Sequence, residues 1–452
     1  MHCVYPMDIG GRNEHYLRDM DDLLELSAAI IESGDVDKPF NRITNELTEV
    51  ADGLAVVESF SHSVVVDSGD GLVAFDASHV NTGAAVVEAI GGWRSDPVRQ
   101  LIYTHGHADH VGGSVHFDAA YGDMNVVGHE NVEQRFDRYR DTNAWNVLIN
   151  ARQFGGVRGD FEMGDADEPD FIPKHTLAPT HVVGDHDTIE IGDRTIELHH
   201  ARGETDDHLW GWMPNEKWLF AGDFVIWNFP NAGNPQKVQR YPIEWAAALR
   251  DMASRRPEIL LPAHGLPVGG ADRIEEMLTT IASTLEKLAS DVITMMNAGE
   301  VLDTIIHSVR VDPAMLAKPY LRPLYDEPEF VIRNIWRQFG GWWDGAPSRL
   351  KPSPDAALAA EIAHLAGGAH RLAQRASELA DESDFRMASH LADLAAWAAP
   401  DDRSVHGTRA EVYRARRQAE TSLMAKGIFA GAMRESAAVA DEADGESPTQ
   451  RQ

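Results

Sequence analysis

Hydrophobic and polar positions change their pattern twice along the chain, and the changes divide it into three predicted regions. Residues 1–50 are charged and weakly periodic apart from a helical stretch at Leu23–Ile31, and we interpret them as an N-terminal arm. From Gly53, short apolar or alternating runs separated by turn residues predict strands mixed with helices. After Gly270, apolar residues at helical spacing predict one long amphipathic helix, and residues 354–440 predict a series of Ala-rich helices.

The strand-rich region predicts the layered packing of an α/β domain, in which helices cover sheets. The expected strands are Leu54–Ser59, His62–Asp67, Leu72–Phe75, Arg99–Tyr103, Asn125–Val127, Thr188–Ile191, Thr195–His199, His208–Met213, Lys217–Phe220 and Glu258–Leu261. The Ala-rich helices predict a helical domain, because alanine at helix crossings permits close packing. We therefore expect an α/β domain at residues 51–345, a helical domain at 346–436 and a flexible tail at 437–452.

The charge of the chain limits its expected partners. Its 452 residues include 40 Lys and Arg against 72 Asp and Glu, a formal net charge of −32. So acidic a surface repels phosphate backbones and anionic lipid heads, so we expect neither nucleic acid nor a membrane as a partner. The lone Cys3 excludes internal disulfides and fits a reducing compartment, and Met1–Asp37 contains no basic segment followed by an apolar core. These features predict a cytoplasmic protein.

A cluster of metal-binding side chains lies in the segment Thr104–Gly113, between a predicted strand and a predicted helix, where ligands can converge. The segment contains three imidazoles and one carboxylate, namely His105, His107, Asp109 and His110. Imidazole and carboxylate together suit a borderline divalent metal such as zinc. Because one loop cannot wrap a single ion with all four groups, the motif predicts two metals that share it. The alternative is a polar loop that happens to contain three histidines.

Further ligands must then come from elsewhere, and three later positions qualify. Glu204, Asp223 and His264 each lie at the end of a predicted strand. Taken singly, Glu204 and Asp223 are also typical of solvated turns, and His264 of a hydrogen-bonded loop. Their order after the histidine motif favours the interpretation as metal ligands.

That order resembles the metallo-β-lactamase superfamily, whose motifs are an early Asp, His-x-His-x-Asp-His, a later strand-end ligand, a bridging Asp and a late His. The resemblance implies an αββα sandwich that binds two Zn²⁺ ions or mixed divalent metals. It assigns His105, His107 and Glu204 to one metal and Asp109, His110 and His264 to the other, with Asp223 as the bridge and Asp76 orienting a ligand.

Glu204, within Arg202–Thr205, occupies a position where most of the superfamily has His, and in this it resembles the bacterial alkylsulfatases. The segment Trp342–Pro347 and the Ala-rich helices are similar to the linker and dimerisation domain of that branch. The resemblance spans residues 53–435 and implies a homodimer, whereas the alternative is that the helices pack only on the α/β domain. The bridging position differs, because well-known alkylsulfatases carry Glu where this chain has Asp223.

Glu204 also changes the expected charge of the site, because three carboxylates and a hydroxide would neutralise two Zn²⁺ ions. Positive side chains should then help to bind an anionic substrate, and Arg240 is the first candidate, followed by Arg152. An Arg after the bridging carboxylate resembles a sulfate-contacting Arg of the alkylsulfatases, whereas surface salt bridges are the alternative for both. Candidates for an apolar pocket wall are Phe154, Tyr241, Trp145, Trp227 and Phe229, which could equally be core residues.

Together these features predict a dinuclear zinc hydrolase that cleaves the sulfate ester of an alkyl or other hydrophobic alcohol by metal-activated water. The residues expected to act in catalysis are Asp109, Asp223 and Arg240. Lactone, thioester, phosphodiester or β-lactam hydrolysis would need the same metals. A redox di-iron site is a second alternative, but such sites commonly have Glu where this chain has His107. The complete ligand set argues against a third, a non-catalytic dimerising protein.

Overall fold

The computed structural model describes residues 22–35, 41–154 and 170–441, which fall into two compact units. The first, the α/β unit, takes in the described residues up to Val147 and from 170 to Trp342. The second, the helical unit, takes in residues 148–154 and 343–441. None of the described helices combines the length and apolar composition that a membrane crossing requires.

The first sheet of the α/β unit has seven strands within the described residues, in the order β1-β2-β3-β4-β5-β6-β7. They are Leu47–Ala51 (β1), Leu54–Val57 (β2), Ser63–Asp67 (β3), Leu72–Phe75 (β4), Val98–Ile102 (β5), Asn125–His129 (β6) and His181–Val183 (β7). Strands β1 to β4 pair antiparallel, and β4 to β7 pair parallel. Strands β2 and β4 are buried at every position, because both faces of the sheet are covered.

The second sheet, as far as the chain is described, has six strands in the order β13-β12-β11-β10-β9-β8. They are His186–Ile191 (β8), Arg194–His200 (β9), Leu209–Met213 (β10), Trp218–Gly222 (β11), Ile259–Pro262 (β12) and Val268–Gly269 (β13). Only β11 and β12 pair parallel among these strands, and β8 lies at an edge. Strands β8 and β9, and likewise β10 and β11, lie where strands were predicted and pair antiparallel as hairpins.

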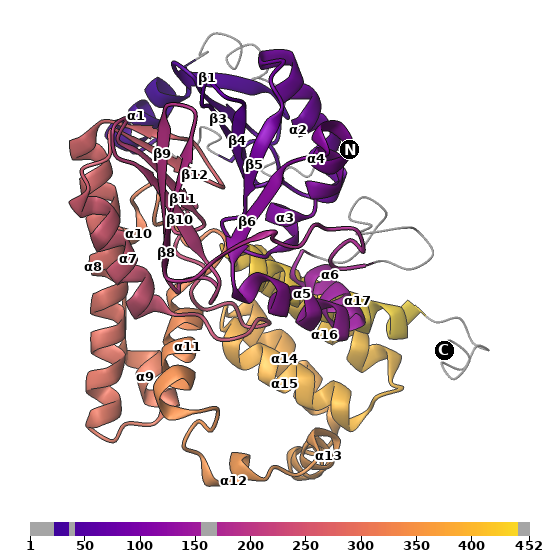
Figure 1. Ribbon diagram of the computed structural model, residues 1–452. Helices are drawn as coiled ribbons and strands as arrows, with labels where there is room; N and C mark the ends of the chain where they lie inside the picture. Colours follow the sequence, from indigo (N-terminus) through magenta and orange to yellow (C-terminus); the bar gives the residue numbers. More distant parts are fainter. Residues whose placement is uncertain (1–21, 36–40, 155–169, 442–452) are drawn as a thin grey trace. The chain divides into compact units, whose positions relative to one another are not determined.

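The two sheets face each other, and helices cover their outer faces (Figure 1). Phe75 of β4 stacks on Phe220 of β11 with ring centroids 4.0 Å apart, inside one buried apolar cluster that both sheets share. The helices against the first sheet are α2 (Val80–Trp93), α4 (Ser114–Tyr121) and α5 (Asn131–Asp141). Those against the second are α1 (Leu23–Ser33), α7 (Pro242–Ser254), α8 (Ala271–Asn297), α9 (Leu302–Ser308) and α11 (Pro328–Gly340). The expected αββα sandwich is therefore confirmed.

The helical unit packs its helices through small residues, as the Ala-rich sequence predicts. Its helices are α12 (Pro347–Leu350), α13 (Asp355–Ala366), α14 (Ala369–Asp381), α15 (Phe385–Ala398), α16 (Arg403–Ala419) and α17 (Leu423–Asp441). Buried alanines such as Ala373, Ala376 and Ala392 lie between them. A Cβ atom on Gly427 would come 1.8 Å from the Gln153 carbonyl oxygen, so only glycine lets α17 lie this close to the end of α6 (Asn143–Gln153).

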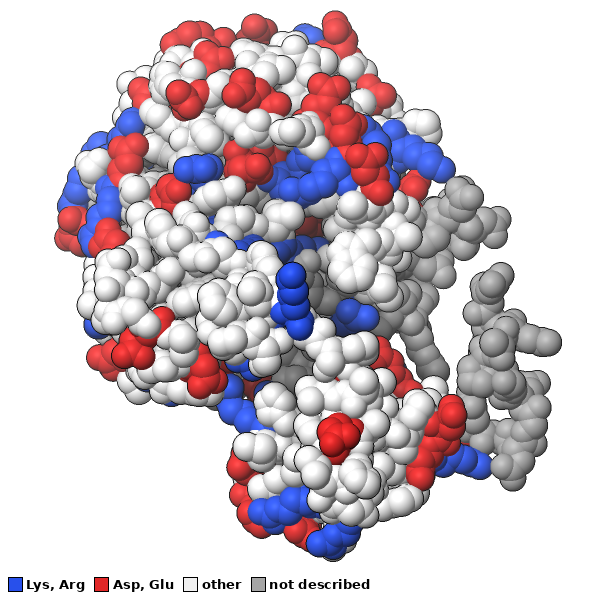
Figure 2. Space-filling model, turned by 90° about the horizontal axis from the view of Figure 1, so that it is seen from below, with Lys and Arg blue, Asp and Glu red and all other residues white. Residues whose placement is uncertain are grey.

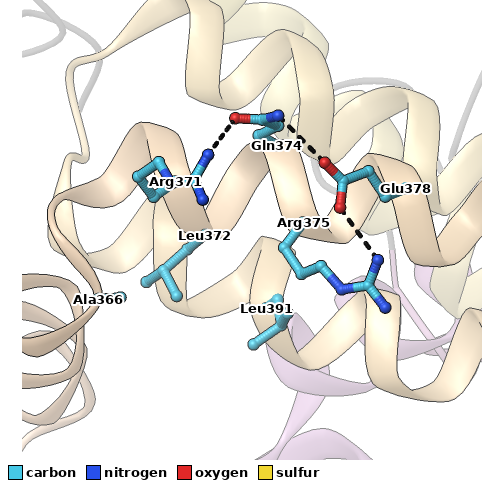
Figure 3. Close-up of a pocket in the computed structure, with 7 residues that line it drawn as sticks. All are labelled: Ala366, Arg371, Leu372, Gln374, Arg375, Glu378 and Leu391. Carbon is cyan, nitrogen blue, oxygen red and sulfur yellow. Dashed lines mark hydrogen bonds and ion pairs between the residues drawn. The ribbon is translucent and has the colours of Figure 1, made fainter.

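The helical unit contains a pocket whose polar side chains bond to one another (Figure 3). It is lined by Ala366, Arg371, Leu372, Gln374, Arg375, Glu378 and Leu391. Arg371 donates to Gln374 at 2.8 Å, and Arg375 forms an ion pair with Glu378 at 3.0 Å. The pocket contains none of the seven predicted metal ligands.

Two predicted boundaries differ from the structure. Residues Leu47–Val50, predicted to lie in an N-terminal arm, form β1 together with Ala51, because a turn at Gly53 (φ 74°) pairs them with β2. Helix α17 continues to Asp441, beyond the point at which the flexible tail was expected to begin. The rest of that tail and the arm residues 1–21 and 36–40 lie outside the described residues.

Candidate metal centre

The seven predicted ligands converge from four strand ends of the α/β unit. His105 and His107 follow β5, and the short helix α3 (Ala108–Val111) carries Asp109 and His110. Glu204, Asp223 and His264 follow β9, β11 and β12 respectively. The structure gathers them into two groups, whose potential ligand atoms lie within 4.8 Å of one another: His105, His107, Glu204 and Asp223, and Asp109, His110 and His264.

Asp223 faces both groups. Its Oδ2 atom lies 3.9 Å from His105 Nε2, while its Oδ1 atom lies 3.5 Å from His110 Nε2 and 3.6 Å from His264 Nε2. A carboxylate that presents one oxygen to each group has the arrangement that a bridging ligand requires. Asp109 Oδ2 is 3.5 Å from His264 Nε2, which closes the second group.

Unpaired polar atoms within these groups fit a divalent cation. His110 Nε2, Glu204 Oε2 and Asp223 Oδ1 are buried and have no hydrogen-bond partner among the described residues. Each buried polar atom left unpaired costs about 1–3 kcal/mol, so three of them at one place are unlike an ordinary protein interior. His105 Nε2 and His107 Nδ1 also face each other at 2.8 Å. Imidazole and carboxylate donors aimed at a common point fit zinc or a similar metal.

Asp76 holds His110 and the start of the histidine loop. Its Oδ1 atom accepts the Thr104 N–H at 2.8 Å, and its Oδ2 atom accepts the Thr104 hydroxyl at 2.7 Å and lies 2.8 Å from His110 Nδ1. Because the carboxylate accepts, His110 Nδ1 carries the hydrogen and Nε2 is left for a metal. Asp76 adopts a φ of 60°, a strained conformation for a residue other than glycine. The contact is of the kind that the resemblance implied for Asp76, and its role beside a metal stays a prediction.

Two buried histidines that the sequence analysis missed position the ligands. His208 Nε2 accepts the Asp223 N–H at 3.1 Å, and its ring stacks on His105 with centroids 4.7 Å apart. His62 Nε2 donates to the carbonyl of Gly265, next to His264, at 2.9 Å. Burial lowers the pKa of both imidazoles to about 3, so both are neutral at physiological pH. Neither has a motif spacing that could have identified it.

A buried ion pair joins the histidine loop to the loop of Glu204. Asp207 Oδ2 accepts the N–H of Gly106, between His105 and His107, at 3.0 Å. The same oxygen accepts Arg135 Nε–H at 2.8 Å, and the Arg135 guanidinium also contacts Asp206. Asp207 and Arg135 are 0% and 3% exposed. These contacts fasten both loops to α5, and sequence reasoning did not identify them.

The ligand residues differ in their tendency to carry charge even without a metal. Burial lowers the pKa values of His105 and His107 well below the usual range. Although burial opposes it, the Asp223 carboxylate raises the pKa values of His110 and His264. Burial likewise opposes ionisation of Asp109 and Asp223, but His110 holds the pKa of each carboxyl below its ordinary value. The site therefore offers two ionised carboxylates to a cation.

Arg240, the predicted substrate-binding cation, lies beside Glu204. It is 3% exposed; its Nη1 atom contacts Glu204 Oε1 and donates to the Asn231 carbonyl at 2.9 Å, and Asn231 Nδ2 contacts the same Glu204 oxygen. Burial raises the pKa of Glu204 well above its usual range, and the Arg240 guanidinium opposes that shift. Arg240 thus orients Glu204, and its contact with substrate stays a prediction.

Lys237, three residues before Arg240, is a second cation near the ligands. Burial and then the charge of Arg240 lower the pKa of its ammonium to about 7, while the carboxylates of Asp109 and Glu204 act in the opposite direction. Its Nζ atom lies 5.2 Å from the centre of the Phe171 ring. The group can therefore change its protonation state near neutral pH.

The remaining predicted substrate residues are distributed over both units. The Tyr241 N–H donates to the Gly203 carbonyl at 2.9 Å, beside Glu204, and its ring is half-buried under Arg202. Arg152 and Phe154 belong to the helical unit, where a Cβ atom on Gly431 of α17 would lie 3.4 Å from Arg152 Cγ. Their role at the site stays a prediction.

The predicted aromatic wall needs correction. Trp227 and Phe229 are fully buried in the core of the α/β unit, and Trp227 Nε1 donates to the Leu266 carbonyl at 2.8 Å. Both belong to the buried apolar cluster between the second sheet and its helices. Trp145, by contrast, is 55% exposed.

Two family models match the chain. One, described as the metallo-beta-lactamase superfamily, matches residues 56–264, and the other, described as alkyl sulfatase dimerisation, matches residues 301–438. The second match includes α9 and α11, which the structure places in the α/β unit. The family segment is therefore longer than the helical unit.

Curated relatives and solved structures agree with these models. A linear primary-alkylsulfatase from Pseudomonas sp. (strain ATCC 19151) is 23% identical over 373 residues, which are 77% of this chain and 69% of the relative. An alkyl/aryl-sulfatase from Saccharomyces cerevisiae is 24% identical over 360 residues, 75% of this chain and 55% of the relative. The solved structure of the stereoselective inverting sec-alkylsulfatase Pisa1 from Pseudomonas sp. has a TM-score of 0.77 at 20% identity, covering 87% of this chain and 66% of that one. This likeness shows a shared fold, and the chain spans between about half and two thirds of these proteins.

Proposed function

The chain belongs to the metallo-β-lactamase superfamily of hydrolases, in its alkylsulfatase-like branch with a dimerisation domain, and we propose that it hydrolyses sulfate esters of hydrophobic alcohols at two zinc ions. One observation carries the proposal: Asp223 joins two complete groups of ligand atoms, and the first of them contains Glu204 rather than histidine. The curated relatives, at 22–24% identity, are named for alkyl sulfates.

His105, His107 and Glu204 would hold one ion, and Asp109, His110 and His264 the other, with Asp223 between them. Such ions act as Lewis acids toward an ester oxygen and bring the pKa of water towards neutrality. The protein's own part is to fix the donors: Asp76 sets the tautomer of His110, and His208 holds the backbone of Asp223. Donors held before substrate arrives need no rearrangement during the reaction.

The substrate proposal follows from the charges around Glu204. A third carboxylate in the ligand set reduces the net positive charge that the metals offer to an anion. Arg240 and Lys237 supply cationic groups beside Glu204 and Asp109, which suits a monoanionic sulfate ester. Asp109 and Asp223 remain ionised, so each can accept a hydrogen bond from the attacking water at a carboxylate oxygen. Tyr241, next to Arg240 in the chain, completes the proposed substrate site, while the substrate contacts expected of Arg152 and Phe154 stay predictions.

We also propose a homodimer, formed through the segment that matches the alkyl sulfatase dimerisation model. Exposed apolar residues support this: Trp342, Leu365 and Trp397 are 71%, 78% and 41% exposed. Light scattering coupled to size exclusion tests it, and a monomer at micromolar concentration would contradict it.

A substrate panel tests the function. Purified protein loaded with zinc is incubated with primary and secondary alkyl sulfates of several chain lengths, and with matched alkyl phosphates, a lactone and a β-lactam. We expect release of inorganic sulfate and little turnover of the other esters, and oxygen-18 water then shows whether the C–O or the S–O bond breaks. Faster lactone or phosphodiester turnover, with sulfate at background, would replace the sulfatase assignment by one of those activities.

A further inference from the structure

A second, separate cluster of metal-binding side chains lies on the β8–β9 hairpin. His186 on β8 and His199 on β9 are direct partners in the antiparallel register, and Glu197 precedes His199 by two residues. Side chains alternate between the faces of a strand, so all three project from the same face. None of them belongs to the seven ligands of the candidate metal centre.

The three side chains are already close enough to share an ion. Their potential ligand atoms lie within 4.8 Å of one another, and His199 Nε2 is 3.3 Å from Glu197 Oε2. Ligand atoms on one tetrahedral zinc lie about 3.4 Å apart, given Zn–N and Zn–O bonds of about 2.1 Å. Rotation of the exposed His186 side chain supplies the remaining approach, because its ring centroid is 4.7 Å from that of His199.

The surroundings fix two of the three donors in a binding-competent state. His199 stacks on Trp210 with ring centroids 4.3 Å apart, which holds its orientation. Burial, and then the nearby Arg255, lower the pKa of His199, so its imidazole is neutral and can donate a lone pair. Burial opposes ionisation of Glu197, but Arg255 holds the pKa of its carboxyl below the ordinary value.

Arg255 binds one carboxylate oxygen of Glu197 and leaves the other available to a metal. Its Nη1 atom donates to Glu197 Oε2 at 2.8 Å, the same oxygen that faces His199. A carboxylate has two oxygens, so Oε1 can still bind a cation while Oε2 keeps the guanidinium. The strongly acidic chain, with its net charge of −32, favours a bound dication electrostatically.

We propose that His186, Glu197 and His199 form a third metal site, for Zn²⁺ or another divalent transition metal, that ties the edge strand β8 to β9. Two imidazoles and one carboxylate are a donor set typical of zinc, with water completing the coordination. Strand β8 ends its sheet among the described residues, and edge strands are held on one side only. A cross-strand metal would therefore add a second link between this edge strand and its neighbour β9.

The test compares zinc stoichiometry between variants. Wild-type protein, the double variant His186→Ala/His199→Ala and the control His307→Ala, which removes an exposed histidine elsewhere in the α/β unit, are dialysed against the same free Zn²⁺ concentration. Metal content is then measured by mass spectrometry. We expect the double variant to hold one equivalent fewer than both other proteins while it keeps hydrolytic activity. Equal zinc content in all three proteins would overturn the proposal.

A second measurement distinguishes loss of the third site from misfolding of the variant and from loss of metal at the candidate metal centre. The thermal midpoint of each protein is recorded with EDTA and with Zn²⁺. The double variant should gain less from zinc than the wild type, whatever midpoint it has in EDTA after losing the His199–Trp210 contact, and His107→Ala should keep the equivalent bound at the hairpin. The comparison depends on differences between variants, so it stands or falls independently of the sulfatase proposal. A zinc-induced increase identical in the double variant and the wild type would refute the third site.

Discussion

Replacing Asp207 with Asn should weaken metal binding although Asp207 is not a proposed ligand. Asp207 Oδ2 accepts the Gly106 N–H at 3.0 Å and the Arg135 Nε–H at 2.8 Å, and both ionic side chains are buried. Asn has nearly the same volume and can still accept one hydrogen bond. It removes the negative charge that balances Arg135, so the substitution isolates the electrostatic part of the contact.

The expected size of the effect follows from burial. Removing one partner of a buried ion pair costs about 3–5 kcal/mol, because it leaves the other charge uncompensated. Arg135 keeps its contact with Asp206, whose side chain is 43% exposed and hence a weaker partner. We therefore expect a loss of about 3 kcal/mol in the free energy of unfolding. Displacement of the Gly106 loop should also weaken zinc affinity by about 10-fold, the lower end for residues that orient metal ligands.

Two assays separate these effects. Urea unfolding of the EDTA-treated protein measures the loss of stability, and competition with a chromophoric chelator measures zinc affinity. Asp206→Asn is the matched control, because it removes the exposed partner of the same guanidinium and should cost about 1 kcal/mol or less. If Asp207→Asn and Asp206→Asn behave alike in both assays, the reasoning from buried charge is refuted.

Three further predictions concern buried residues of the α/β unit and ligands of the candidate metal centre. His107→Ala should lose bound zinc by mass spectrometry and lower turnover by at least about 100-fold, with an unchanged circular dichroism spectrum, and retained activity would remove His107 from the ligand set. Gly222→Ala should lower the free energy of unfolding by about 1–3 kcal/mol in urea, because Gly222 has a φ of 52° and its Cβ would lie 2.6 Å from His208 Cε1, and an unchanged midpoint would argue against this packing. Burial raises the pKa of Asp326 from 3.8 to about 7, so between these pH values the folded state binds one proton more than the unfolded state. The stability that this proton contributes at low pH is therefore lost as the pH rises towards 7. Asp326→Asn should flatten this slope of at most about 1.4 kcal/mol per pH unit, and equal slopes in both proteins would disprove the shift.

The elements that could be predicted from the sequence are those with a clear period. The Ala-rich helices between residues 354 and 440 and the two strands β8 and β9 agree with their predictions. Strands β7 and β13, with three and two residues, were not predicted, because runs so short carry no period. Strand β1 was missed for a different reason: its residues are polar at several positions, and only pairing with β2 makes them a strand.

The proposed ligands were readable from the sequence because they occur in a fixed order at strand ends. Their partners were not, because the fold supplies them from segments distant in sequence. Arg135 lies on α5 and reaches Asp207, 72 residues later, while His62 reaches Gly265 across 203 residues. A single chain shows no spacing that marks such contacts.

The position of an aromatic residue between two ligands in the sequence did not predict whether it lines the pocket. Trp227 follows Asp223 closely in sequence but is fully buried in the core, since aromatic side chains contribute the largest apolar area to bury.

The net charge of the chain was also a weak guide to the site. The net charge of −32 describes the outer surface, and on the face in Figure 2 acidic and basic residues of the described chain are interspersed. It gave no indication of the cationic Arg240 and Lys237 beside the ligands.

The most direct test of the central proposal is the release of inorganic sulfate from a linear alkyl sulfate as zinc is added to the metal-free protein. Sulfate is measured by ion chromatography at each ratio of zinc to protein, with His107→Ala as the control. The account predicts that release rises with zinc until the candidate metal centre is filled and that it stays at background in His107→Ala. Sulfate release that needs no metal, or no release at any zinc ratio, would contradict it.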